Sequence, residues 1–248
     1  MSLVRPPKSL LRLVGSAIAD YQMIRPGDRV LLGLSGGKDS FALLHLLLHL
    51  QRHAPISFEV AAITVDPQSP DFDPSPLKTV VPAMGIPYFY ESQAILEQAQ
   101  AHMDGDSYCS FCARMRRGVL YTQARRHGYN VLALAQHLDD LAESFLLSSF
   151  HGGRLKTMKA HYVNDAGDVR IIRPLVYVRE RQTTAFASAA ALPVIAENCP
   201  ACFTAPTQRQ HFKELLAREE QSNRHLFKSL LTAMRPIMGT VPDGSSSG

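Results

Sequence analysis

The residues best suited to chemistry lie in one short stretch, which reads Ser35-Gly36-Gly37-Lys38-Asp39-Ser40. A glycine pair lets the backbone turn tightly and bring its N–H groups against an anion. The apolar run 41–50 predicts a helix whose positive N-terminal end faces the same anion, and the run 30–34 predicts a buried strand just before the loop. Strand, loop and helix together predict a phosphate-binding site, with an ordinary glycine-rich turn as the alternative.

The residue after the lysine separates this loop from the Walker loop. That motif has a glycine where this chain has Leu32, and a Ser or Thr where this chain has Asp39. A carboxylate suits Mg²⁺, while Lys38 and the hydroxyls of Ser35 and Ser40 suit pyrophosphate, so we expect ATP as the bound nucleotide. The stretch resembles the PP-loop ATP pyrophosphatase superfamily, which implies adenylation of a substrate with loss of pyrophosphate.

A second acidic motif, at residues 136–144, follows the apolar run 131–135. It resembles the H-H-x-D-D-x-x-E-[ST] segment of tRNA-modifying PP-loop proteins, which implies that Asp140 shares Mg²⁺ with Asp39. His137 is a candidate for contacting phosphate or the reacting base, or else a hydrogen-bonded structural residue. The chain departs from the pattern at Gln136, where a histidine is usual, and at Leu138, which leaves the substrate open.

The four cysteines form two C-x₂-C pairs, Cys109 with Cys112 and Cys199 with Cys202. Thiolates at this spacing bind a metal, and in a reducing compartment they argue against structural disulfides. The separation between the pairs is longer than in zinc ribbons, so spacing alone leaves zinc, an iron–sulfur cluster and a redox dithiol open.

The surroundings of the pairs resemble the tRNA 2-thiocytidine synthetase family. Its C-S-x-C-x-R-x-R-R-G signature matches residues 109–118, and the residues after its second pair match 208–210. The similarity covers roughly residues 10–235. That resemblance implies a [4Fe–4S] cluster on Cys109, Cys112 and Cys202, with Cys199 outside the coordination and one iron open to an exogenous sulfur.

Basic residues follow the first cysteine pair in the predicted helix 113–127. Guanidinium groups suit phosphate backbones and stacked bases, so Arg114, Arg116 and Arg117 are predicted to bind RNA, as is Lys156 in a second basic loop. The alternative is a solvated helix face.

Alternation of predicted strands and helices positions these residues. The predicted strands are 30–34, 58–65, 87–91, 131–135 and 169–172. This pattern predicts an α/β fold, a parallel twisted sheet with helices on both faces, and the resemblance implies an adenine nucleotide α-hydrolase-like arrangement. Ligands of such sheets bind beyond the carboxyl ends of the strands, where Ser35, Asp66 and Asp140 fall, so Asp66 is a further nucleotide-binding candidate.

The chain of 248 residues suits one sizeable domain. We expect an N-terminal helical extension at 1–26, the catalytic domain at 27–235 and a flexible tail at 236–248. The N-terminus has no signal-peptide pattern and no run is long enough to span a membrane, so a cytoplasmic protein is expected. The net charge of +4 is too small to prove a nucleic-acid partner.

These observations predict an ATP-dependent sulfurtransferase that thiolates a tRNA base, with C2 of an anticodon-loop cytidine as the implied target. The implied partners are tRNA and a cysteine desulfurase or other sulfur donor, and a homodimer is left open. One alternative is a PP-loop enzyme acting on another tRNA base or a free nucleobase. The other is a zinc-stabilised nucleotide- or RNA-binding module without turnover.

Overall fold

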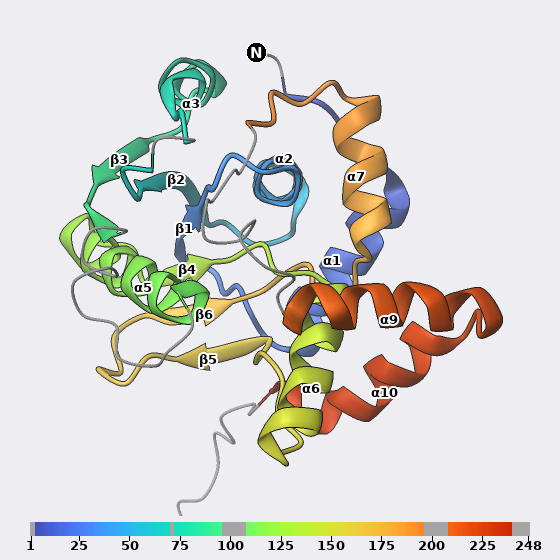
Figure 1. Cartoon of the computed structure of the whole chain (residues 1–248). Helices are drawn as coiled ribbons and strands as arrows, with labels where there is room; N and C mark the ends of the chain where they lie inside the picture. Colours follow the sequence, from blue (N-terminus) through green and yellow to red (C-terminus); the bar gives the residue numbers. More distant parts are fainter. Residues whose placement is uncertain (1–2, 70–71, 96–107, 196–207, 240–248) are drawn as a thin grey trace, which may run out of the picture.

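A six-stranded sheet organises the chain in the computed structural model (Figure 1), which describes residues 3–69, 72–95, 108–195 and 208–239. The strand order is β3-β2-β1-β4-β6-β5. Neighbouring strands are parallel except β5, which runs antiparallel to β6 at the edge. The predicted α/β class with a mostly parallel sheet is therefore confirmed.

The strands are β1 (Arg29–Gly33), β2 (Glu59–Asp66), β3 (Tyr88–Ser92), β4 (Val131–Ala133), β5 (His161–Val163) and β6 (Arg170–Ile172). The described helices are α1 (Lys8–Asp20), α2 (Lys38–His53), α3 (Ser75–Val80), α5 (Tyr108–Arg126), α6 (Leu138–Gly152), α7 (Glu180–Ala189), α9 (Gln208–Ser222) and α10 (Leu226–Met238), with a 3₁₀ turn, η1 (Pro82–Met84).

The middle of β1 and the whole of β4 are apolar without interruption because both faces of the sheet are covered. Along β1, Val30 and Leu32 enter one core and Leu31 enters the other, and all three are fully buried. Successive side chains of a strand point to opposite faces of the sheet. A strand that is covered on both faces therefore lacks the alternation of apolar and polar residues seen in half-exposed strands. The short apolar run in the sequence is the direct result.

Helices divide unequally between the two faces (Figure 1). The larger core joins α1, α2, α6, α7 and α10 to the sheet, whereas the smaller core lies beneath α5, through Leu120 and Ala124. The segment expected as an N-terminal extension packs into the larger core, because Leu10 and Val14 of α1 are almost completely buried there.

Three details differ from the sequence-based expectations. The edge strand β5 was not expected, since its three residues carry no apolar run. Helix α5 begins at Tyr108, so Cys109 and Cys112 lie inside the basic helix and not before it. Helix α10 continues through Pro236 to the buried Met238, three residues into the segment expected as tail.

None of the helices in the described part of the chain is both long enough and apolar enough to cross a membrane.

A buried polar network ties the amino ends of the strands together, at the edge opposite the phosphate loop. Asp28 is 4% exposed and accepts hydrogen bonds from the Arg25 backbone (2.6 Å) and the Asn130 side chain (3.0 Å). The Arg170 guanidinium pairs with the same carboxylate. A buried charge with a full set of partners holds β1, β4 and β6 at one level.

Replacing Asp28 with Ala should therefore lower the free energy of unfolding by about 3 kcal/mol, because it leaves the largely buried charge of Arg170 without its partner. Urea denaturation measures this. The matched control is Glu59→Gln, which removes an exposed ion pair with Arg29 and should change stability little. Equal losses in the two variants would contradict the assignment of Asp28 as the organising charge.

Candidate functional site

Three helix N-termini meet at the carboxyl edge of the sheet. Helix α2 follows β1, α6 follows β4, and α7 follows β6. Strands β1 and β4 are neighbours, but the chain runs from β1 outward to β2 and β3 on one side and from β4 to β6 on the other. The strand order therefore reverses between β1 and β4, and open α/β sheets bind ligands at such a point. The positive ends of the three helices make the position favourable for anions.

The glycine loop takes a conformation that demands glycine. Gly36 has a φ of +90°, which L side chains rarely adopt. A Cβ there would also overlap the side chain of Ile195, whose backbone N–H donates to the Gly36 carbonyl at 3.1 Å. The loop is therefore shaped by its own sequence and by the segment that follows α7.

Hydroxyl and ammonium groups line the loop as predicted. Ser35 Oγ accepts from the Gly37 N–H at 3.2 Å, and Ser40 Oγ donates to the Gly37 carbonyl at 2.9 Å. Lys38 Nζ lies 3.0 Å from both Asp39 and Glu180. Burial lowers the pKa of Lys38, but the two carboxylates outweigh it, so the pKa is raised and the side chain is a cation.

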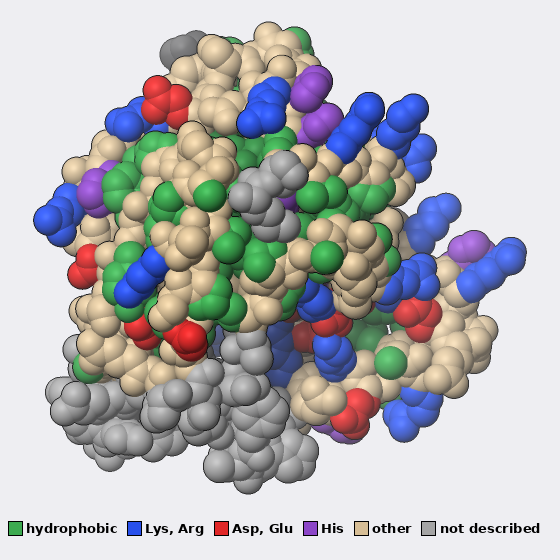
Figure 2. Space-filling view, turned by 90° about the horizontal axis from the view of Figure 1, so that it is seen from above, with side chains coloured by type: hydrophobic (Ala, Val, Ile, Leu, Met, Phe, Trp, Pro, Cys, Tyr) green, Lys and Arg blue, Asp and Glu red, His purple; other side chains and the backbone are tan. Residues whose placement is uncertain are grey.

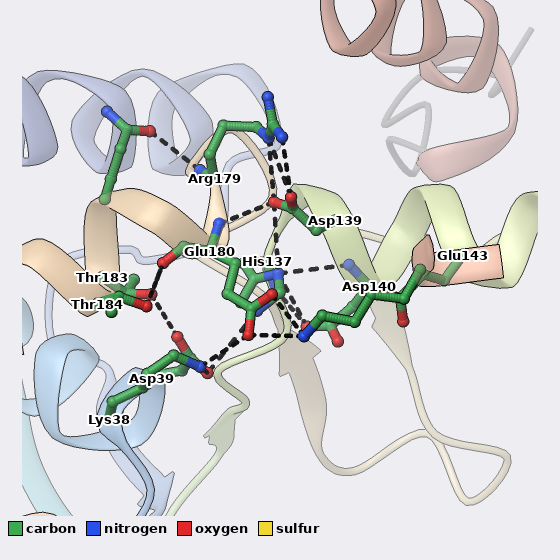
Figure 3. Close-up of polar contacts among 12 residues, drawn as sticks. Lys38, Asp39, His137, Asp139, Asp140, Glu143, Arg179, Glu180, Thr183 and Thr184 are labelled. Carbon is green, nitrogen blue, oxygen red and sulfur yellow. Dashed lines mark hydrogen bonds and ion pairs between the residues drawn. The ribbon is translucent and has the colours of Figure 1, made fainter. Parts of the chain in front are cut away.

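His137 and Asp140 form the first turn of α6 by capping each other. The Asp140 N–H donates to His137 Nδ1 at 3.3 Å, and the His137 N–H donates to Asp140 Oδ2 at 2.8 Å. Because Nδ1 accepts a hydrogen bond, the neutral ring carries its proton on Nε2, which faces Asp39 Oδ2 at 3.7 Å (Figure 3). The imidazole thus lies between the two carboxylates predicted to hold Mg²⁺.

Asp139 has a different role from its neighbour. Its carboxylate accepts from the Glu180 N–H at 2.8 Å and from Arg179 at 3.1 Å (Figure 3). Arg179 also forms a two-pronged pair with Glu220 at 2.7 and 2.8 Å and lies over the Phe227 ring. Asp139 therefore joins α6 to α7, and Asp140 is the aspartate of this pair that lines the cavity.

The cavity at this edge has a volume of about 310 Å³ and mixes both signs of charge. Its lining residues are Asp39, His137, Asp140, Glu143, Glu180, Arg209, Gln210 and Lys213. They come from α2, α6, α7 and α9, with His137 just before α6, so four separate segments close one site.

The two predicted magnesium ligands fit a hard cation that is completed by phosphate. Asp39 and Asp140 present carboxylate oxygens to the same cavity. Within the described residues, no group of three or more His, Cys, Asp or Glu side chains is placed to hold a metal ion. Mg²⁺ commonly uses one or two carboxylates together with waters and substrate phosphates, so this arrangement suits a metal that arrives with its nucleotide.

Several residues of the site are not predicted by the sequence patterns. Glu180 bridges Lys38 and Lys213, and Thr183 donates to Asp39. The sequence did contain one indication of Glu180, because it is an acidic residue at the start of the helix that follows the strand 169–172. The N-terminus of that helix lies at the same edge of the sheet as the phosphate loop. Arg209 lies in the family motif at 208–210, but the motif alone gives it no role.

The two departures from the family pattern lie outside the lining of the cavity. Gln136 accepts a hydrogen bond from the Arg173 guanidinium at 2.8 Å, and Leu138 is 4% exposed in the larger core. Asp66 also lies apart: it ends β2 and accepts from the Gln68 N–H at 2.8 Å and from the Tyr90 hydroxyl. Its nucleotide-binding role stays a prediction.

The predicted cluster ligands are only partly within the described structure. Cys109 and Cys112 are three positions apart in α5, a spacing that puts two positions on one face of a helix, and Cys112 is half-buried. Cys199 and Cys202 lie outside the described residues. The helix therefore places these two positions on one face, and the assignment of all three cysteines as cluster ligands stays a prediction.

The predicted RNA-binding residues differ in exposure. Arg114 and Lys156 are exposed, while Arg116 and Arg117 are half-buried. The Nε of Arg116 is buried without a hydrogen-bond partner among the described residues.

Comparison with known proteins places the chain among PP-loop proteins. The family model for the PP-loop domain matches residues 10–199. The tRNA-cytidine(32) 2-sulfurtransferase of Geobacter sulfurreducens is 42% identical over 228 residues, covering 92% of this chain and 89% of its own. That of Nitrosomonas europaea is 40% identical over 232 residues, covering 93% and 73%.

A solved structure shares the fold. The U34-tRNA thiolase NcsA of Methanococcus maripaludis, determined with its [4Fe-4S] cluster, superposes with a TM-score of 0.76 at 21% identity. The match covers 97% of this chain and 80% of that one. At this level of identity the likeness concerns the architecture.

Gly36→Ala should weaken binding of α,β-methylene-ATP by about tenfold or more, because the new Cβ both strains the backbone and overlaps Ile195. Calorimetric titration measures the affinity. Gly153→Ala is the matched control, since that glycine also has positive φ (+58°) but no described atom within 4 Å of the place a Cβ would take. Equal affinities in the two variants would show that the loop does not contact phosphate.

The carboxylate of Glu180 should stabilise the fold in a defined pH range. Burial would raise its pKa, but Lys213 and Lys38 bring it down to about 2, below the ordinary 4.5. Its contribution is therefore complete above pH 4.5 and is lost as the pH falls toward 2. The stability difference between wild type and Glu180→Gln, from denaturation at several pH values, should shrink over that interval; a difference independent of pH would contradict it.

Proposed function

Because the chain belongs to the PP-loop family and, within it, to the tRNA-cytidine(32) 2-sulfurtransferases, we propose that it replaces the C2 oxygen of cytidine 32 in tRNA by sulfur. It is an ATP-dependent tRNA sulfurtransferase. The observation that carries the proposal is the meeting of Asp39, in the first turn of the helix after the glycine loop, and Asp140 at one cavity. A nucleotide and an RNA base then share one edge of the sheet.

The chemical difficulty is the leaving group. Displacement of the C2 oxygen by sulfur is slow until that oxygen is bonded to the α-phosphorus of ATP, with release of pyrophosphate. The adenylated oxygen then departs with AMP when a sulfur nucleophile forms the new bond to C2. The chain must therefore bind triphosphate, orient the base, and stabilise charge on departing pyrophosphate.

The phosphate loop supplies this stabilisation. The Gly36 and Gly37 backbone turns at the start of α2, where N–H groups and the helix dipole attract phosphate oxygens. Lys38 is held at the loop as a cation by Asp39 and Glu180, and it neutralises negative charge that collects on pyrophosphate. Mg²⁺ held by Asp39 and Asp140 would neutralise further charge when it is bound.

His137 orients both parts of the site. Its ring contacts Asp140 through the cap and faces Asp39, so it fixes the separation of the two carboxylates. With Nε2 as its proton-bearing atom, it is positioned to donate a hydrogen bond within the cavity.

A [4Fe–4S] cluster on Cys109, Cys112 and Cys202 would supply the sulfur carrier beside the activated base. Support comes from the placement of the first two cysteines in one helix and from the presence of a cluster in the U34-tRNA thiolase of the same fold. A sulfur donor such as a cysteine desulfurase is part of the proposal, and a homodimer is left open.

The tRNA is proposed to lie over the carboxyl edge of the sheet. Seen from above, Lys and Arg side chains gather over the side of the molecule where α7 and α9 lie (Figure 2). The exposed Arg114 and Lys156 add positive charge on other segments. Phosphate contacts of this kind position RNA without reading its sequence.

Reconstitution tests the function directly. We expect anaerobically purified protein, supplied with ATP, Mg²⁺, sulfide and unmodified tRNA, to form 2-thiocytidine at position 32, detected by mass spectrometry of nucleosides. Asp140→Asn should abolish thiolation and AMP release while the visible absorbance of the cluster persists. Thiolation at another base would reject the cytidine assignment.

Cysteine variants test the metal. Cys202→Ala should lose both visible absorbance and 2-thiocytidine while it keeps affinity for α,β-methylene-ATP; Cys199→Ala, the matched control, should keep all three. A colourless wild-type protein with stoichiometric zinc would instead favour a nucleotide-binding module without turnover. Loss in Cys199→Ala alone would reverse the ligand assignment.

A further inference from the structure

Helix α9 brings an arginine onto the acidic side of the nucleotide cavity. Arg209 donates to Asp140 Oδ1 through a terminal nitrogen at 2.5 Å and to Glu143 Oε2 through Nε at 2.8 Å. One guanidinium therefore bridges two carboxylates of α6. Both lie in the cavity that the proposed function assigns to magnesium and ATP.

The oxygen that Arg209 contacts is the one a metal would need. Oδ2 of Asp140 already accepts the His137 N–H in the helix cap, and this bond fixes the carboxylate. Oδ1 is the oxygen left to a further ligand, and Arg209 donates to it. A guanidinium and a divalent cation on the same oxygen repel each other, so their occupancies compete.

The position of Arg209 allows it to release Asp140 while it keeps its bond to Glu143. Its side chain is 52% exposed, so a rotation of the guanidinium disturbs no packed core. Glu143 is 5% exposed and needs a charged partner, and its bond from Nε provides a pivot. Rotation about that bond frees Asp140 while Glu143 stays paired.

Lys213, one turn further along α9, offers a comparison. Its ammonium lies 2.8 Å from Glu180. It contributes the same charge to the same cavity, but it pairs with Glu180 where Arg209 pairs with Asp140. A general effect of charge and a specific contact with Asp140 can therefore be separated experimentally.

We propose that Arg209 is a positioning residue that occupies Oδ1 of Asp140 before the nucleotide binds and yields that oxygen to the arriving magnesium ion. This inference rests on the proposed function, because it takes Asp140 as a magnesium ligand.

Binding of Mn²⁺ to the nucleotide-free full chain, measured by electron paramagnetic resonance of the free ion, tests the competition. Arg209→Gln should bind Mn²⁺ about tenfold more tightly than wild type, and Arg209→Lys should fall between them. Lys213→Gln, the control for charge alone, should give a clearly smaller rise. Unchanged or weaker binding in Arg209→Gln, or an equal rise in Lys213→Gln, would overturn the inference.

Asp140→Asn separates this inference from the proposed function. If Asp140→Asn loses Mn²⁺ binding while Arg209→Gln shows no gain in Mn²⁺ affinity, the proposed role of Arg209 is wrong and the metal site is supported. Intact Mn²⁺ binding in Asp140→Asn would reject both. No binding to any nucleotide-free variant would reject the role of Arg209 alone, because a metal that arrives with its nucleotide is consistent with the proposed function.

Hydrogen exchange of the wild-type protein provides a further test of the inference that needs no variant. Addition of Mg²⁺ and α,β-methylene-ATP should increase amide exchange in the first turn of α9, since Arg209 then loses its contact with Asp140 and keeps only its bond to Glu143 on α6. A merely structural arginine predicts no change or slower exchange there, and either result would refute the exchange of partners.

Discussion

The convergence of three helix N-termini at one sheet edge is the constraint on which the rest of the structure depends. Each helix end exposes N–H groups and a partial positive charge, and three of them together require negative partners. The chain provides these as Asp39, Asp140 and Glu180, each in the first turn of its own helix. The same positive potential that stabilises these carboxylates also attracts a triphosphate. Lys38, which pairs with Asp39 and Glu180, offsets part of their negative charge.

The segment that carries the second cysteine pair is bounded by contacts to this edge. Ile195 lies against Gly36 of the phosphate loop before it, and Arg209 holds Asp140 after it. Further along, Arg179 connects Asp139 to Glu220 and fixes the far part of α9. Helix α9 therefore lines the cavity proposed as the nucleotide site.

The sequence was sufficient to predict those features that rest on local pattern. Buried strands show as continuous apolar runs, and the glycine loop has a positive φ at Gly36 that only its residue type reveals. Pairings between distant segments were not predictable: the ion pairs of Lys38 with Glu180 and of Arg209 with Asp140 depend on how α7 and α9 fold back. The short strand β5 was missed because its pairing with β6, and not its composition, makes it a strand. The roles of Gln136 and Leu138, which leave the substrate open, were also not predictable: Gln136 contacts Arg173 and Leu138 packs in the larger core.

Strand pairing also determines when this protein becomes able to bind its nucleotide during folding. Asp39 and Asp140 come together only when β1 pairs with β4, which sets Val30 beside Val131, after the intervening β2, β3 and α5 have been synthesised. Such long-range pairing is slow, because a large loop must close before its contacts are gained. A chain whose synthesis stops before α6 contains the glycine loop but not Asp140. Because ATP binds best when both are present, it stabilises the completed sheet relative to partly folded forms. The ligand therefore stabilises only the form of the chain in which β1 and β4 have paired.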